Sequence, residues 1–218
     1  MPRYSLIVFD LDGTLVDSRR DIADAANALL AERGAAPLPE ETIGRMVGDG
    51  AGQLVTRAFA AAGVAEPPDA LARFLDIYDA RLLGHTRAYD GIADVLSTLA
   101  AQVPLAVLTN KPREAAGRVL EGVGLARFFP ASRVLGGDGP LPRKPDPAGL
   151  RHLAADAAAS PDTTILVGDS VVDWRTARQA GSAVCLARYG FGFDTFPRER
   201  LDGRECAVDS PRELLGVL

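Results

Sequence analysis

The feature that most constrains this 218-residue chain is the alternation of short apolar runs with amphipathic segments. The first run lies near the start of the chain, and the regular alternation begins after residue 91. Apolar runs that predict strands lie at 4–9, 104–108, 133–135, 164–167, 183–187 and 204–208. Segments that predict helices lie between or after them, at 92–101, 114–120, 147–158, 174–180 and 211–215. This alternation predicts an α/β fold, a Rossmann-like doubly wound parallel sheet with helices on both faces.

Residues 17–87 have a different pattern, because they contain no strand-like run. Apolar residues recur at helical spacing over 22–33, 53–62 and 69–83, and glycines and prolines separate these segments. We therefore expect two domains: an α/β core from residues 1–16 and 88–218, and a small all-helical lobe from residues 17–87 inserted after the first strand.

Composition excludes several classes of function. A formal net charge of −5 argues against nucleic acid as a main partner, because a phosphate backbone needs a basic surface. The first apolar run ends at Asp10, too early for a signal peptide or a membrane span. Cys185 and Cys206 are too few for a disulfide framework and suit free thiols. We expect a cytoplasmic protein with a small-molecule partner and no membrane partner.

Two acids follow the first predicted strand, within the segment FDLDGTLVDS. Residues two apart in an extended chain point the same way, so the carboxylates of Asp10 and Asp12 can enter one site. Two neighbouring carboxylates need a cation or a shared proton to offset their repulsion. The alternative is a solvated tight turn at Asp12-Gly13.

Polar residues also follow the strand predicted at 104–108, where Thr109 and Asn110 could hold the oxygens of an anion. The chain has 22 arginines and only two lysines, Lys111 and Lys144, and both lie next to such motifs. Lysine at these two positions therefore indicates that the compact, flexible ammonium group is required there, and that an arginine would not serve. For Lys144, in the segment RKPDP, an ordinary exposed residue at a helix start is the alternative.

A second acid pair, Asp169 and Asp173, follows the strand predicted at 164–167. Residues four apart share one face if a helix begins here, although Asp169 could instead be only a helix N-cap. Oxygen ligands with few carboxylates favour Mg²⁺.

These motifs, in this order, resemble the four motifs of haloacid dehalogenase superfamily hydrolases over essentially the whole chain. The helical lobe at 17–87 lies where that superfamily carries its smaller cap. LTNKP, the segment VLGGD ending at Asp138, and VGDGAG at 47–52 are most similar to phosphoglycolate phosphatases.

The resemblance implies a Mg²⁺-dependent phosphomonoester hydrolase that forms an aspartyl-phosphate, with 2-phosphoglycolate as substrate. Asp10 would be the nucleophile, and Asp12 the general acid and then the general base. The implied magnesium ligands are Asp10, the backbone carbonyl of Asp12, Asp169, and Asp173 directly or through water. The implied phosphate-binding residues are Thr109, Asn110 and Lys144.

Residues that could select the leaving group are the loop glycines Gly48 and Gly50, Arg45 beside them, and Lys111. We also predict that Arg45 could pair with a substrate carboxylate. Alternative substrates are nucleotides, sugar phosphates and pyrophosphate, and a beta-phosphoglucomutase-type phosphomutase has the same core motifs. Asp12 argues against a dehalogenase, and the absence of lysine from 17–87 argues against a phosphonatase. A non-catalytic binding protein is disfavoured because every acid that the chemistry needs is present.

Overall fold

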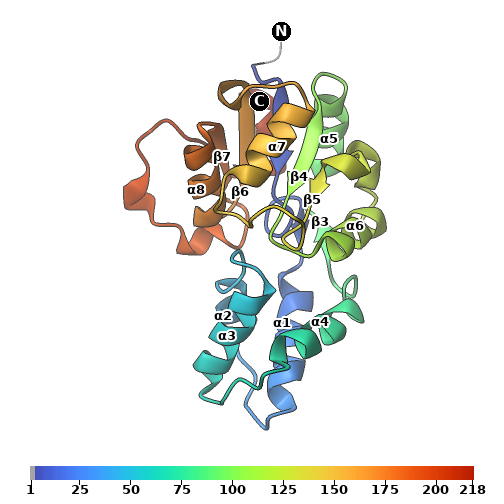
Figure 1. Cartoon of the computed structure of the whole chain (residues 1–218), viewed down its shortest axis with the longest axis vertical. Helices are drawn as coiled ribbons and strands as arrows, with labels where there is room; N and C mark the ends of the chain where they lie inside the picture. The colour runs from blue at the N-terminus through green and yellow to red at the C-terminus, as the bar shows by residue number, and fades with distance from the viewer. Residues whose placement is uncertain (1–2) are drawn as a thin grey trace.

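The computed structural model describes residues 3–218 and has an α/β core above a bundle of helices (Figure 1). The core sheet has six parallel strands in the order β5-β4-β1-β6-β7-β8. Their bounds are β1 Leu6–Phe9, β4 Leu105–Leu108, β5 Val134–Leu135, β6 Thr164–Gly168, β7 Ala183–Ala187 and β8 Cys206–Val208. This confirms the predicted fold class.

Both faces of the sheet are buried, so β1 can be apolar at every position. Leu6 and Val8 pack on one face with α7 (Ala148–Asp156) and α8 (Val171–Ala180). Ile7 and Phe9 pack on the opposite face. That face is covered by α5 (Ile92–Ala100), α6 (Arg113–Gly122) and α9 (Leu214–Val217). Helices on both faces make the sheet doubly wound.

The first four helices after β1 form a separate bundle, the helical lobe. They are α1 Arg19–Ala31, α2 Glu40–Gly44, α3 Ala51–Ala62 and α4 Ala70–Asp79. The chain enters and leaves the lobe through a two-residue antiparallel pair, β2 (Val16–Asp17) and β3 (Arg87–Ala88). Neither this pair nor the five-residue α2 was predicted from the sequence.

The remaining elements are 3-10 turns at Ala126–Phe128, Ala131–Arg133, Pro161–Thr163, Phe193–Thr195, Arg198–Arg200 and Pro211–Glu213. Among the described residues, no helix is long and apolar enough to cross a membrane.

Strand order determines where a ligand can bind. After β1 the chain continues to β4 on one side of it and later returns to β6 on the other side. The carboxyl ends of β1, β4 and β6 therefore meet at the point where the strand order reverses, which is where open α/β sheets bind ligands.

Candidate active site

The loop after β1 brings two acids to this edge of the sheet. The backbone N–H of Asp10 donates to the Val167 carbonyl at 2.8 Å, which continues the pairing with β6. The chain then turns at Gly13, whose φ is +87°. A Cβ there would lie 1.9 Å from Asp169 Oδ2, so only glycine allows the loop to pass this close to the second acid pair.

Three buried carboxylates form a cluster at the ends of β1 and β6. Asp10, Asp169 and Asp173 each offer an oxygen within 4.8 Å of the others. The Lys144 Nζ lies 2.8 Å from Asp10 Oδ1 and 2.6 Å from Asp173 Oδ1. The structure thus brings Lys144 and three of the predicted metal ligands together, and Lys144 is buried rather than an exposed residue at a helix start.

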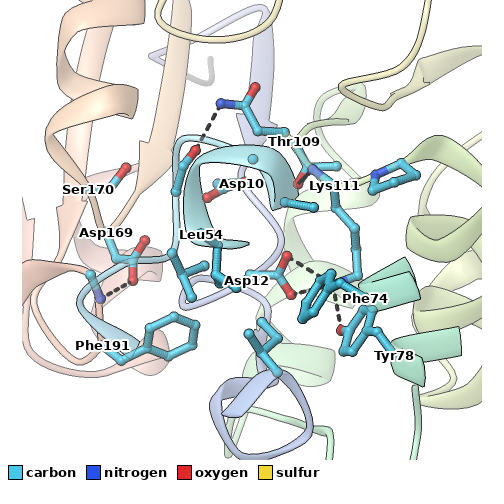
Figure 2. A pocket seen from close by; sticks show the side chains of 18 of the residues that line it. Asp10, Asp12, Leu54, Phe74, Tyr78, Thr109, Lys111, Asp169, Ser170 and Phe191 are labelled. Atoms are coloured by element: carbon cyan, nitrogen blue, oxygen red, sulfur yellow. Dashed lines mark hydrogen bonds and ion pairs between the residues drawn. The ribbon is translucent and has the colours of Figure 1, made fainter. Parts of the chain in front are cut away.

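The start of α8 positions the second acid pair. The helix begins at Val171, earlier than predicted, and Ser170 rather than Asp169 is its N-cap. The Asp173 backbone N–H donates to Ser170 Oγ, and Asp173 Oδ2 accepts from the Ser170 backbone N–H at 3.1 Å. Asp169 does not cap the helix, and its carboxylate accepts a hydrogen bond from the Gly192 N–H at 2.7 Å. Its carboxylate faces the cavity (Figure 2).

The charges in this cluster are unbalanced. The pKa of Asp10 is raised from 3.8 to about 7, chiefly by burial, with Lys144 lowering it and Asp173 raising it. Burial and the carboxylates of Asp10 and Asp173 also raise the pKa of Asp169 well above its ordinary value. A bound cation would offset this repulsion, and the all-oxygen donor set fits a hard divalent metal ion.

Asp12 lies beside the cluster in a contact network of its own (Figure 2). Its carboxylate accepts a hydrogen bond from Ser18 Oγ at 2.5 Å. It also accepts two from Lys111 Nζ, at 3.0 and 3.1 Å. The same ammonium donates to the Tyr78 hydroxyl of α4 at 2.7 Å. Burial would lower the pKa of Lys111, but Asp12 and Tyr78 raise it well above its ordinary value, so the residue stays charged.

Thr109 and Asn110, which follow β4, make different contacts. Thr109 is buried in the cavity wall, and its Oγ1 accepts a hydrogen bond from the Lys111 backbone N–H at 3.2 Å. The Asn110 side-chain amide donates to the carbonyls of Gly48 at 2.8 Å and Lys144 at 2.9 Å. This amide therefore connects the lobe loop to the core, and the phosphate contact of Asn110 stays a prediction.

The cavity lies between the core edge and the helical lobe. Gly48 and Gly50 of the loop at 47–52 line it, and their part in selecting a leaving group stays a prediction. Arg45 is exposed and is not among the lining residues, so the predicted pairing of Arg45 with a substrate carboxylate has no support in the geometry.

Sequence reasoning missed several lining residues, including Phe74, Tyr78 and Phe191. Phe74 and Tyr78 lie four residues apart on α4 and stack with ring centroids 5.8 Å apart. Helical spacing shows that they share a face, but it does not distinguish a face in the core from a cavity wall. Ser18, which contacts Asp12, carried no signal beyond its place at the end of FDLDGTLVDS.

The fold and this arrangement of acids and lysine define a hydrolase of a known class. Residues 7–187 match the haloacid dehalogenase-like hydrolase family, and the chain belongs to that family.

Individual relatives have more specific names. A protein of Rhodospirillum rubrum named phosphoglycolate phosphatase is 46% identical over 194 residues, which cover 85% of this chain and 80% of that protein. A Caulobacter vibrioides protein of the same name is 40% identical and covers 85% of this chain and 79% of its own length. The crystal structure of a predicted phosphoglycolate phosphatase from Haemophilus somnus superposes with a TM-score of 0.89 at 30% identity, covering 100% of this chain and 99% of its own.

Proposed function

We propose that this chain is a Mg²⁺-dependent phosphomonoesterase whose substrate is 2-phosphoglycolate. The observation that carries the chemistry is the buried cluster of Asp10, Asp169 and Asp173 around Lys144, next to Asp12. The substrate is supported by the names of the relatives from Rhodospirillum rubrum and Haemophilus somnus.

In the proposed reaction, a carboxylate oxygen of Asp10 forms a bond to phosphorus, and the bond between phosphorus and the leaving-group oxygen breaks. Asp12 donates a proton to that oxygen. Asp12 then takes a proton from a water molecule whose oxygen attacks phosphorus, which releases inorganic phosphate and restores Asp10. Thr109 and Lys144 would stabilise the oxygens of the transferring group, where the charge of a loose transition state is spread.

The proposed magnesium ligands are Asp10, Asp169, the backbone carbonyl of Asp12, and Asp173 directly or through water. The bound ion would offset the charge of the phosphate and orient it toward the nucleophile. Lys144 would hold Asp10 in position through the 2.8 Å contact.

We propose that residues 17–87 act as a cap that encloses the substrate and contacts its leaving group. Two observations support this: the cavity is lined from both the core and the lobe, and Asn110 joins the Gly48 carbonyl of the lobe loop to the core. An enclosed site would exclude water from the first half-reaction.

The test is phosphate release from 2-phosphoglycolate, hexose phosphates, nucleoside monophosphates and pyrophosphate, each with Mg²⁺ and with EDTA. We expect metal-dependent turnover with 2-phosphoglycolate preferred. Asp10→Asn should abolish turnover, whereas Asp76→Asn, which changes an exposed acid of α4, should not. Retained turnover in Asp10→Asn would refute the mechanism, and equal rates on all esters would refute the substrate.

A further inference from the structure

The wall of the cavity that would face a leaving group is almost entirely apolar. Ile22, Leu54 and Phe74 line it from the lobe, and Phe191 lines it from the core. A sugar or a nucleobase would place several hydroxyl or amide groups against this wall without partners, which is costly in a buried site.

One cationic group interrupts the apolar wall. Within the described part of the chain, Lys111 is the only residue with a cationic side chain among those that line the cavity. Its side chain is 4% exposed, and its ammonium group lies 4.6 Å from the centroid of the Tyr78 ring. An anionic leaving group entering beside Asp10 and Asp12 needs a cation close by, and Lys111 is placed to supply it.

The position of the ammonium also matches the length of a small acid. In the proposed reaction Asp12 gives its proton to the ester oxygen, so that oxygen must lie at the Asp12 carboxyl group. Lys111 Nζ is 3.0 Å from the same carboxyl group. A carboxylate separated from the ester oxygen by a single CH₂ group would therefore lie within reach of Lys111.

We propose that Lys111 is the specificity-determining residue of the site and selects phosphate esters with a carboxylate one carbon from the ester oxygen. In the free protein its ammonium is held by Asp12 and by the Tyr78 hydroxyl of the lobe. In the complex it pairs with the substrate carboxylate between the apolar walls. This inference rests on the proposed function and explains which leaving group the cavity accepts.

The experiment compares two substrates that differ only at the leaving group. The first is 2-phosphoglycolate, and the second is 2-hydroxyethyl phosphate, in which CH₂OH replaces the carboxylate. Phosphate release is measured with Mg²⁺ for the wild type, Lys111→Met, Lys111→Arg and Arg20→Met. Arg20→Met is the matched control, since it removes a cation of α1 that is exposed and does not line the cavity.

We expect the wild type to prefer 2-phosphoglycolate and Lys111→Met to lose that preference. A hydrogen-bonded charged contact contributes roughly tenfold to hundredfold, so the ratio of the two kcat/KM values should fall by about that factor. Lys111→Arg should retain a preference for the acid, and Arg20→Met should match the wild type. Thermal unfolding identifies a misfolded Lys111→Met, and Lys111→Gln, which keeps a donor toward Asp12, would then replace it.

Other outcomes would overturn the inference. If Lys111→Met slowed both substrates equally, Lys111 would serve Asp12 alone and would not recognise the leaving group. If the wild type hydrolysed both esters equally well, the phosphatase proposal would stand and this inference would fail. If the wild type released phosphate from neither ester, the proposed function would fail, and this inference with it.

Discussion

Replacing Asp10 by asparagine should stabilise the metal-free protein at pH 8 while abolishing its activity. The pKa of Asp10 is about 7 in the folded protein, against an ordinary 3.8. Such a raised pKa means that the folded state holds the proton more tightly than the unfolded state does. The resulting stability is fully present below about pH 4 and is lost as the pH rises through 7.

The size of the effect follows from the same values. A pKa of about 7 in place of 3.8 corresponds to about 4 kcal/mol against the ionised form in the folded state above pH 7. The pKa of about 7 already includes the attraction between Lys144 and the ionised carboxylate, so the neutral asparagine should recover the whole of about 4 kcal/mol. At 2–4 °C per kcal/mol the melting temperature should rise by roughly 8–16 °C.

The assay is thermal unfolding of the wild type and Asp10→Asn in EDTA at pH 4 and pH 8, repeated at pH 8 with Mg²⁺. We expect the stabilisation at pH 8 only, because at pH 4 the folded wild type already carries a neutral Asp10. Mg²⁺ should raise the melting temperature of the wild type more than that of the variant. Equal melting temperatures in EDTA at pH 8, or the same difference at both pH values, would refute the electrostatic reasoning.

Three further changes test other parts of the site. Gly13→Ala should lower kcat by about 10²-fold, because the added Cβ would displace the Asp169 carboxylate. A normal rate would show that the loop can move aside. Asn110→Ala should lower the free energy of unfolding in urea by about 1–3 kcal/mol, because it removes the hydrogen bonds to the Gly48 and Lys144 carbonyls. Unchanged stability would contradict the conclusion that Asn110 holds the lobe loop against the core. Arg45→Met should leave kcat/KM for 2-phosphoglycolate within about twofold, because the Arg45 side chain is exposed and outside the cavity lining. A larger loss would show that Arg45 does contact the substrate.

The parts of the fold that could be predicted are those that the sheet itself dictates. A parallel strand buried on both faces is apolar at nearly every position, so runs such as 164–167 and 183–187 were predicted almost to the residue. Acids that follow strands must meet at one edge, which was enough to bring Asp10 and Asp169 together. Lys144 was identified because lysine is so rare in this chain.

The parts that could not be predicted depend on side chains that meet across long stretches of sequence. Lys111 contacts Tyr78 33 residues earlier and Asp12 99 residues earlier, and no local pattern encodes either distance. The direction of the Asn110 amide was likewise decided by two carbonyls of other loops. Arg45 lies close to the cavity loop in sequence, but the turn after α2 leaves its side chain exposed.

The two lysines and four acids of the site together explain why a divalent ion suits it. Lys144 offsets one charge of the Asp10, Asp169 and Asp173 cluster, and Lys111 offsets that of Asp12. Two negative charges are left over, and both belong to this cluster, in which the pKa values of Asp10 and Asp169 are raised. A divalent cation held there would neutralise the cluster without drawing Lys111 away from the cavity wall. Lys111 would therefore remain available for an acidic leaving group, so the metal site and substrate choice are parts of a single charge balance.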